Sequence, residues 1–439
     1  MPIWEKTQEF ITKKLKQKLL QEKKQKAFYS DVFRKIEDKV KKSLKNRETD
    51  TALYDLTVWA LALWASDIHY ETFEKYVLVR FRIDGILTEV FKLDYKQYKV
   101  VLERLKYSAN LKLNITNVPQ DWKYEIKIKE KNWEKVDVRV STLPTKYWEN
   151  VVSRLLDASK AILSFEDLWF FWTTKRMIEK SISKKNWLIL VTGPTGSWKT
   201  TTLYTILSKL NTPDKKIITL EDPIEYELPW VIQSEVNEKT WFTYSTWLKA
   251  LLRQDPDVIM VWEIRDKTTL DTATSASLTG HLVLSTLHTK SAADTLDRII
   301  NMWLKPYIIA SAVDTIIAQR LVRKLCPYCK KQRDKNPWET ALIKNMMKDI
   351  WMNNIPIENL KLYDAVWCSK CWNTWYKWRM WIYEIINFSE EIREIVREWA
   401  SAEEIVKSAR WKDFILMKED WILKAIKWYT TLEEVLRVT

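Results

Sequence analysis

Glycine is the residue that this chain most clearly lacks. Its 439 residues include 4 glycines and 26 tryptophans, whereas glycine usually makes up about 7% of a soluble protein. So few glycines would exclude most of the tight turns and left-handed helix ends that depend on this residue. Glycine and tryptophan together reach the usual glycine share, which indicates that tryptophan stands where glycine is expected.

Tryptophan also occurs at positions where local geometry favours glycine. Asn132–Trp133 lies between two alternating segments, where a hairpin turn needs positive φ. Pro229–Trp230 has the form of the Pro-Gly pair of a type II turn. Trp303 and Trp428 each follow an apolar helical stretch, at the left-handed cap position. We hypothesise that many of these tryptophans are UGA codons that the source organism decodes as glycine.

Long apolar runs and abundant cysteine are absent as well. No run approaches the 18 or more apolar residues of a membrane-spanning helix, so we expect a cytoplasmic protein. Its 46% hydrophobic and 30% charged residues are typical of a soluble chain with several domains. The 4 cysteines form two close pairs, which favours a metal site in a reducing compartment over disulfides.

Acidic residues do not balance the basic ones, and the net charge is +14. Residues 1–47 hold 15 Lys and Arg against 6 Asp and Glu. This segment predicts a basic helical arm that could make peripheral contact with anionic lipid or an acidic partner. A solvated lysine-rich helix without a ligand is the alternative. No base-reading motif accompanies the charge, so no nucleic-acid partner is expected.

The periodicity of the chain changes near residue 160. Tyr76–Ile83 alternates as a strand does, Asp84–Gly85 predicts a turn, and residues 125–129 and 136–140 alternate again. From about residue 170 to 322, apolar strands alternate with helical stretches, which is typical of a parallel sheet covered by helices. The sequence therefore predicts an α+β domain followed by an α/β domain.

Residues 193–200 match the phosphate-binding pattern G-x-x-x-x-G-K-[ST] except that Trp198 replaces its last glycine. A buried-type strand over 188–192 and a helix over 199–207 give the loop its strand–loop–helix context. Backbone amides would surround the phosphates, Lys199 would contact the β- and γ-phosphates, and Thr200 would offer a hydroxyl to Mg²⁺. The predicted nucleotide-binding residues are Gly193, Pro194, Thr195, Gly196, Ser197, Trp198, Lys199, Thr200 and Thr201.

Glu263 is the predicted catalytic acid. It ends an apolar stretch, Pro256–Glu263, that predicts a second strand. An acid at this place after a phosphate-binding loop could orient the attacking water or hold the Mg²⁺ shell. Trp198 and Trp262, taken literally, would crowd the phosphate site, and the alternative to recoding is a tryptophan-rich protein whose nucleotide site is inactive.

Two C-x₂-C pairs supply the four cysteines. A set of four thiolates with this spacing is the ligand set of a structural zinc site. Free buried thiols are the alternative. The predicted Zn²⁺ ligands are Cys326, Cys329, Cys368 and Cys371.

With Trp198 and Trp262 written as glycine, the chain contains GPTGSGKTTTLY and, further on, RQDPDVIMVGEIRD. Thr219–Tyr226 lies between these two segments, and Thr279–Thr289 follows the second. These segments resemble the Walker A, Walker B, Asp-box and His-box motifs of the secretion ATPase superfamily. More narrowly, the chain resembles the assembly ATPases of type IV pili and type II secretion, over about residues 51–439. The cysteine insert also resembles theirs and is absent from retraction ATPases.

The resemblance implies a homo-hexameric ATPase ring at the inner face of the cell membrane, acting on an inner-membrane platform protein. It implies that Glu221 and Asp222 organise metal and water and that His288 senses the γ-phosphate, with His281 nearby. Arg80 and Arg82, from the preceding domain, are candidates to reach the phosphate. A retraction motor, a nucleotide-binding scaffold without turnover and, more distantly, a DNA-translocating motor are the alternatives.

The expected fold class is α/β, with a RecA-like P-loop ATPase domain preceded by an α+β domain and carrying a zinc-binding insert. The expected divisions are a basic helical arm at 1–50, an α+β (PAS-like) domain at 51–157, a linker at 158–169, the RecA-like core at 170–322, the tetracysteine zinc subdomain at 323–387 and C-terminal helices at 388–439.

Overall fold

The computed structural model divides the chain into two compact units. One comprises residues 1–159, 326–329 and 365–377, and the other comprises residues 160–325, 330–364 and 378–439. Within them, the structure describes residues 31–131, 134–157, 163–236, 244–347, 361–365, 368, 371, 375–398, 404–405, 416–427 and 429–437.

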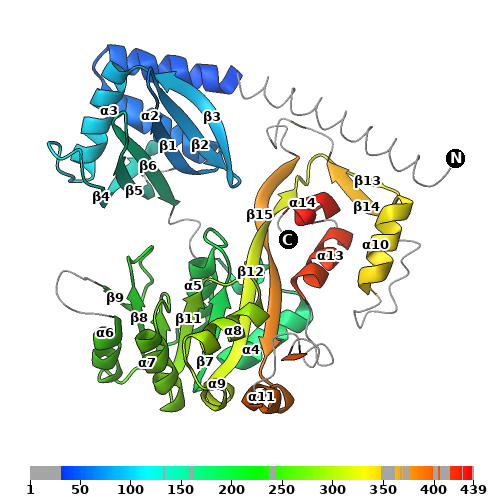
Figure 1. The fold of residues 1–439 in the computed structure, drawn as a ribbon. Coiled ribbons are helices and arrows are strands. Elements are labelled where there is room, and N and C mark those ends of the chain that lie inside the picture. The colour runs from blue at the N-terminus through cyan, green and yellow to red at the C-terminus, as the bar shows by residue number, and fades with distance from the viewer. Residues whose placement is uncertain are drawn as a thin grey trace. The chain divides into compact units, whose positions relative to one another are not determined.

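The first unit contains an antiparallel sheet of six strands in the order β3-β2-β1-β6-β5-β4 (Figure 1). Residues 31–45 are helical, and their apolar residues Val32, Phe33, Ile36 and Val40 belong to the core of this unit. Residues 1–30 of the predicted basic arm lie outside the described residues. The elements of this unit are α2 (Thr49–Ala62), β1 (Ala65–Thr72), β2 (Val77–Ile83), β3 (Ile86–Leu93), α3 (Tyr95–Ser108), β4 (Gln120–Ile128), β5 (Glu134–Pro144) and β6 (Glu149–Asp157).

Alternation of side chains produces this sheet as the sequence predicts. Every second residue of β2 is buried, because successive side chains of a strand point to opposite faces. Asp84 and Gly85 have φ angles of 48° and 84° and connect β2 to β3. The antiparallel pair β4–β5 confirms the two predicted strands, with Ile128 opposite Glu134. The predicted turn at Asn132–Trp133 lies outside the described residues.

The second unit contains a seven-stranded sheet in the order β15-β12-β7-β11-β10-β8-β9. Its elements are α4 (Trp172–Ile182), β7 (Trp187–Thr192), α5 (Lys199–Leu210), β8 (Ile217–Glu221), β9 (Ile232–Glu235), α6 (Tyr244–Leu252), β10 (Val258–Val261), α7 (Lys267–Leu278), β11 (Leu282–Leu287), α8 (Ala292–Asn301), α9 (Pro306–Ala312), β12 (Val313–Leu325), α10 (Pro337–Met347), β15 (Tyr376–Asn387), α11 (Glu390–Arg397), α13 (Met417–Ile426) and α14 (Leu432–Leu436). A separate two-stranded sheet pairs β13 (Lys330–Arg333) with β14 (Leu362–Ala365).

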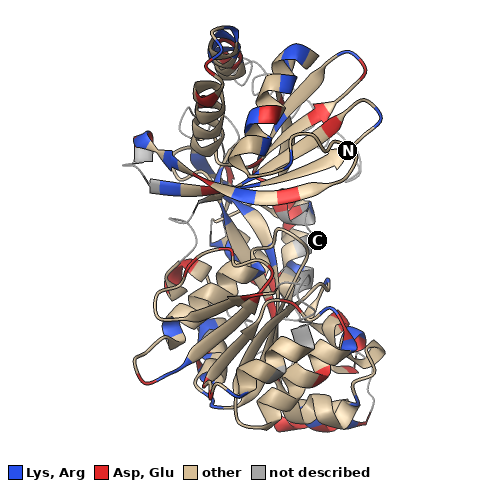
Figure 2. Ribbon diagram, turned by 90° about the vertical axis from the view of Figure 1, so that its left-hand side faces the viewer, with Lys and Arg blue, Asp and Glu red and all other residues tan. Residues whose placement is uncertain are grey.

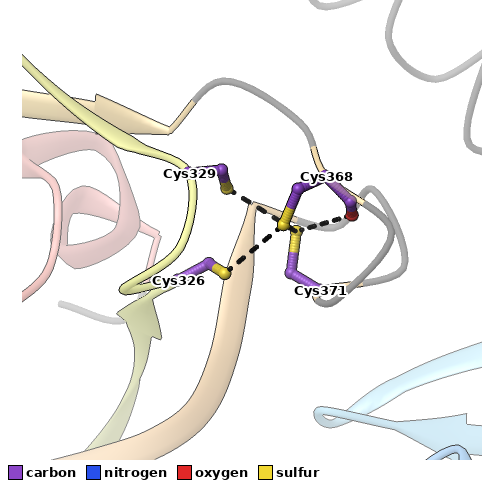
Figure 3. Close-up of side chains that lie close together, drawn as sticks. All are labelled: Cys326, Cys329, Cys368 and Cys371. Atoms are coloured by element: carbon purple, nitrogen blue, oxygen red, sulfur yellow. Dashed lines mark hydrogen bonds between the residues drawn. The ribbon is translucent and has the colours of Figure 1, made fainter.

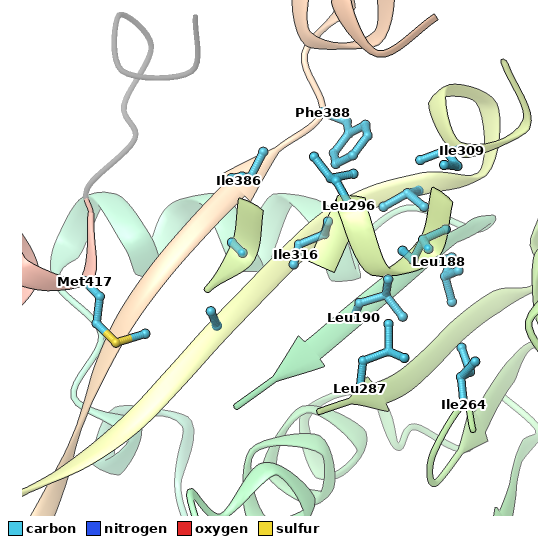
Figure 4. Packing of buried hydrophobic residues seen from close by; sticks show 14 of the residues in the cluster. Leu188, Leu190, Ile264, Leu287, Leu296, Ile309, Ile316, Ile386, Phe388 and Met417 are labelled. Carbon is cyan, nitrogen blue, oxygen red and sulfur yellow. The ribbon is translucent and has the colours of Figure 1, made fainter. Parts of the chain in front are cut away.

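The strands from β12 through β9 run parallel. Strands β7, β10 and β11 contain no charged residue (Figure 2) and are buried over almost their whole length, as parallel strands covered on both faces are. Leu188 and Leu190 of β7 pack in one cluster with Leu287 of β11 and Leu296 of α8 (Figure 4). This rigid sheet supports the loops that follow its strands. The predicted α/β class is confirmed.

One boundary differs from the expectation. The strand predicted over Pro256–Glu263 is observed as β10, Val258–Val261, so Glu263 lies two residues beyond the strand rather than in it. The apolar pattern does not distinguish the last paired residue from the loop that follows. Among the described residues, no helix is both long enough and apolar enough to cross a bilayer.

Left-handed backbone occurs at an unusual residue type. Among the described residues, twelve other than glycine have positive φ, and eight of them are tryptophan. Seven of these tryptophans have φ between 59° and 71°, and they are Trp64, Trp169, Trp198, Trp230, Trp303, Trp375 and Trp378. The left-handed conformation costs a residue with a side chain about 1–2 kcal/mol. Seven such residues would therefore cost about 7–14 kcal/mol, comparable to the whole stability of a protein, about 5–15 kcal/mol.

Candidate active site and metal centre

The phosphate-binding loop lies between β7 and α5, as the sequence predicts. Gly193, Gly196 and Trp198 have φ angles of 150°, 79° and 63°. A Cβ atom on Gly193 would lie 2.4 Å from the backbone oxygen of Gln319, so this glycine is needed for the close packing of the loop against β12. The loop therefore has both the context and the backbone conformations of a nucleotide-binding loop.

Gln319 of β12 holds the loop and the start of α5 through two hydrogen bonds, and the sequence did not predict this role. Its Nε2 donates a hydrogen bond to the Ser197 carbonyl at 2.7 Å, and its Oε1 accepts one from the Thr202 hydroxyl at 2.8 Å. The side chain is fully buried. The only signal in the sequence is an amide residue directly after the apolar run Ile316–Ala318 of β12, and a buried amide needs such partners.

Lys199 and Thr200 begin α5 beside the loop. Lys199 Nζ donates to the Gly193 carbonyl at 3.0 Å. Burial lowers the pKa of Lys199 to about 8, although the nearby Glu263 carboxylate opposes this shift. The indole Nε1 of Trp262 donates to Thr200 Oγ1 at 3.3 Å, so an indole contacts the hydroxyl that is predicted to hold Mg²⁺. The Trp198 ring packs against the Trp381 ring, with centroids 5.6 Å apart.

Three parallel strands bring a second set of polar residues together. Asp222 follows β8, Glu263 follows β10 and His288 follows β11, and the carboxyl ends of parallel strands lie at the same edge of a sheet. Arg265 Nε donates to Glu263 Oε2 at 2.8 Å, and its NH1 donates to Asp222 Oδ2 at 3.3 Å. His288 Nε2 lies 3.3 Å from Glu263 Oε1.

Glu263 is thus held on both oxygens. Burial and the Lys199 charge lower the pKa of His288, while Glu263 opposes them. His288 Nε2 lies within contact distance of Glu263 Oε1. Arg265 belongs to the predicted motif, but its function was not predicted from the sequence. Its link between Glu263 and Asp222 becomes visible only in the folded chain.

Glu221 lies in a different environment from its neighbour Asp222. It is fully buried, and its carboxylate accepts hydrogen bonds from the Tyr204 hydroxyl, from the Thr219 hydroxyl at 2.6 Å and from Gln233 Nε2 at 3.0 Å. Burial raises the pKa of Glu221. Its role in organising metal and water stays a prediction.

The remaining predicted residues have partners nearby. Arg80 and Arg82 lie on β2 of the first unit, where Arg80 pairs with Glu71 and Arg82 lies 3.5 Å from Asp67. Their contact with a nucleotide stays a prediction. His281 follows the end of α7, where its Nδ1 lies 3.0 Å from the Ala276 carbonyl.

The four cysteines converge, although about forty residues separate the two pairs (Figure 3). Their sulfur atoms all lie within 4.8 Å of one another, and three of the separations are 3.8, 3.7 and 3.6 Å. Tetrahedral zinc with Zn–S bonds of about 2.3 Å requires S···S separations of about 3.8 Å.

The cysteine cluster therefore fits Zn²⁺. Burial and the neighbouring Cys371 sulfur raise the pKa of the Cys329 thiol, because both disfavour the thiolate. A bound cation would supply a positive charge that favours the thiolate. The donor set offers no open position, so the metal would be structural.

The sequence pattern of the family described as "Type II/IV secretion system protein" matches residues 50–437. The chain belongs to this family. It is 41% identical to the Type II secretion system protein E of Pseudomonas aeruginosa over 375 residues, which cover 85% of this chain and 72% of that protein. It is 43% identical to the Type IV pilus assembly ATPase PilB of the same organism, again over 375 residues, covering 85% and 64%.

Solved structures agree on the fold. The pilus retraction motor PilT with bound ADP is 25% identical, with a TM-score of 0.59 and coverage of 88% of this chain and 96% of that one. The Legionella pneumophila ATPase DotB, 20% identical, has a TM-score of 0.63 and coverage of 88% and 94%. As a type II/IV secretion system protein, the chain is a P-loop ATPase with ATP, Mg²⁺ and Zn²⁺ as its cofactors.

Proposed function

We propose that this secretion-family ATPase is a hexameric motor that assembles a type IV pilus, or the pseudopilus of a type II secretion system. One observation carries the proposal most strongly. Glu263 is held by Arg265 and His288 in the same unit as the phosphate-binding loop, in a chain 43% identical to a pilus assembly ATPase.

The residues of the site fit ATP hydrolysis. The loop amides and Lys199 bind the phosphates, and Lys199 must leave the Gly193 carbonyl to do so. Thr200 would offer its hydroxyl oxygen as a ligand to Mg²⁺, which would supply positive charge against the phosphates. Glu263 orients the attacking water and accepts its proton. Arg265 and His288 orient the carboxylate, and His288 would respond when the γ-phosphate leaves.

The motor would act at the inner face of the cell membrane on a platform protein, as the resemblance implies. Several lysines of the helical segment 31–45 are exposed, among them Lys35, Lys42 and Lys45. This basic surface supports peripheral contact with anionic lipid. A ring of six copies would let each hydrolysis step move one subunit against its neighbours.

The decisive experiment compares the unmodified gene with a Glu263→Gln allele in the source organism. An assembly motor requires that the mutant lose surface pili or secreted protein and that the purified wild-type protein, as a hexamer, hydrolyse ATP with Mg²⁺. Piliated mutant cells with impaired retraction would show a retraction motor instead. ATP binding with no turnover in the wild type would show a scaffold.

The scaffold is retained as a second candidate because of one contact. If Trp262 is genuine, its indole engages the Thr200 hydroxyl, and Mg²⁺ would have to displace it. The same assay decides this case.

A further inference from the structure

We propose that glycine, and not tryptophan, occupies the seven left-handed tryptophan positions and position 262 of the native protein. Left-handed backbone is visited routinely by glycine and, less often, by asparagine and aspartate. Of the four other non-glycine residues with positive φ in the described chain, three follow this rule, Asp84, Asn110 and Asp255, and Arg47 is the exception. Tryptophan neither lacks a Cβ atom, as glycine does, nor has the short polar side chain with which asparagine and aspartate form local hydrogen bonds.

Helix ends provide a direct comparison within the chain. After α7, Gly280 has φ 108°, and the next residue donates its amide to the Ala276 carbonyl. After α8, Trp303 has φ 67° and donates to Ile300, and the following Leu304 donates to Ile299. These are the paired bonds of a Schellman cap, whose left-handed residue is usually glycine. Thus one helix ends in glycine and another in tryptophan with the same type of cap.

Two of these indoles gain almost no burial in return. Trp303 is 81% exposed and Trp230 is 92% exposed. Trp230 follows Pro229, and the amide of Val231 donates to the Leu228 carbonyl at 3.3 Å. This bond and a φ of 63° give the type II turn, whose third residue is usually glycine. Because these two indoles are exposed, their burial does not offset the cost of the left-handed backbone.

Inside β15 the same conformation recurs. Trp378 has φ 71° within the strand, and Trp375, with φ 70°, precedes its first residue. The Trp375 carbonyl accepts the Cys326 amide at 2.9 Å, so this backbone shape helps hold the first cysteine pair. Glycine inside a strand commonly marks such an irregularity.

At the nucleotide site, glycine would change the chemistry, and this part of the inference rests on the proposed function. Position 198 directly precedes Lys199 and begins α5 from a left-handed residue. Glycine there would clear the ring from the phosphate loop. Glycine at 262 would remove the donor that contacts Thr200 and leave the hydroxyl available to Mg²⁺. We include position 262 in the proposal because of this contact with Thr200, and not because of its φ angle.

The identity of the residues is tested on the native protein. Tandem mass spectra of protein isolated from its source should contain glycine at the eight positions, and the gene should carry UGA at each. Tryptophan in the peptides spanning 198 and 303 would overturn the inference. This measurement does not depend on ATPase activity, so it stands apart from the proposed function.

A second test uses protein expressed in a host that inserts tryptophan. Trp64→Gly lies at the left-handed end of α2 and should raise the melting temperature by about 2–4 °C. The matched control, Trp59→Gly, lies inside the same helix and packs against the core, so it should lower the melting temperature. Equal losses in both variants would contradict the conformational argument.

A third test measures MgATP binding. It compares the protein that carries tryptophan at every written position with a Trp198→Gly/Trp262→Gly double variant. We expect the variant to bind at least about tenfold more tightly, a difference of about 1.4 kcal/mol. Equal affinity would refute glycine at these two positions. Glycine in the native peptides together with a native protein that does not hydrolyse ATP would instead sink the proposed function and leave the glycine assignment standing.

Discussion

The cysteine centre and the nucleotide site differ in what builds them. Side chains build the cysteine centre, and its sulfur atoms already have the separations that Zn²⁺ requires. Backbone amides build much of the nucleotide site, and there the Trp262 indole contacts the hydroxyl predicted to hold Mg²⁺, while the Trp198 ring packs against Trp381. A side-chain site depends on four residue types at the right spacing. A site built from backbone amides also depends on glycine, which has no side chain and allows the left-handed conformations that the loop needs.

Zinc removal should produce the largest effect. Cys371→Ser should abolish stoichiometric zinc and unfold the cysteine insert, because structural zinc sites contribute about 10–16 kcal/mol of binding free energy in small peptides. Zinc analysis and hydrogen exchange over residues 323–387 provide the measurements. Exchange in the parallel sheet should stay slow.

Tyr328→Phe is the control, since Tyr328 lies between two ligands and is 56% exposed. It should keep its zinc. Full zinc occupancy in a Cys326→Ser/Cys329→Ser variant would refute the four-thiolate site.

The Glu263→Gln substitution should produce the second-largest effect, a loss of ATP hydrolysis. The amide cannot accept the proton of water, so turnover should fall by roughly 10²–10⁴, the usual contribution of a general base. MgATP binding should survive. Steady-state ATPase assays measure this effect. Glu227→Gln is the control, because Glu227 is an exposed acid outside this cluster. Parent-level turnover in Glu263→Gln would mean that another group is the catalytic acid.

Lys199→Ala should weaken the nucleotide complex itself. A hydrogen bond to a charged group contributes about 1.5–3 kcal/mol, which corresponds to roughly 10–150-fold in ATP affinity. Titration calorimetry of this variant beside Lys305→Ala, a lysine that precedes α9, separates a specific loss from a general charge effect. Equal affinities for the two variants would exclude Lys199 from the phosphate site.

The smallest effect concerns pH. Without nucleotide, burial lowers the pKa of Lys199 to about 8, and bound phosphate raises it again because anions favour the charged amine. ATP affinity should therefore be flat below pH 8 and fall by up to about tenfold per pH unit above it. Lys199→Arg should remove this dependence between pH 8 and 10, since arginine stays charged. A pH-independent affinity in the parent would contradict the buried lysine.

Local features could be predicted from the sequence because local physics fixes them. The turn at Asp84–Gly85 needed two residues that tolerate positive φ, and both strands beside it followed from alternation. The phosphate loop followed from its spacing between an apolar strand and a helix. The end of β10 could not be placed, since apolar residues continue past the last paired one.

The sequence by itself determined the residue types of both sites: the glycine–lysine–threonine loop, the acid at 263 and two pairs of cysteines. Only the tertiary structure decided which residues meet. Parallel strands reached through helical crossovers bring Asp222, Glu263 and His288 to one edge, although over sixty residues separate the first from the last. Gln319 and Arg265 acquired their roles in the same way, because a buried amide or an arginine finds its partners only once neighbouring strands are packed.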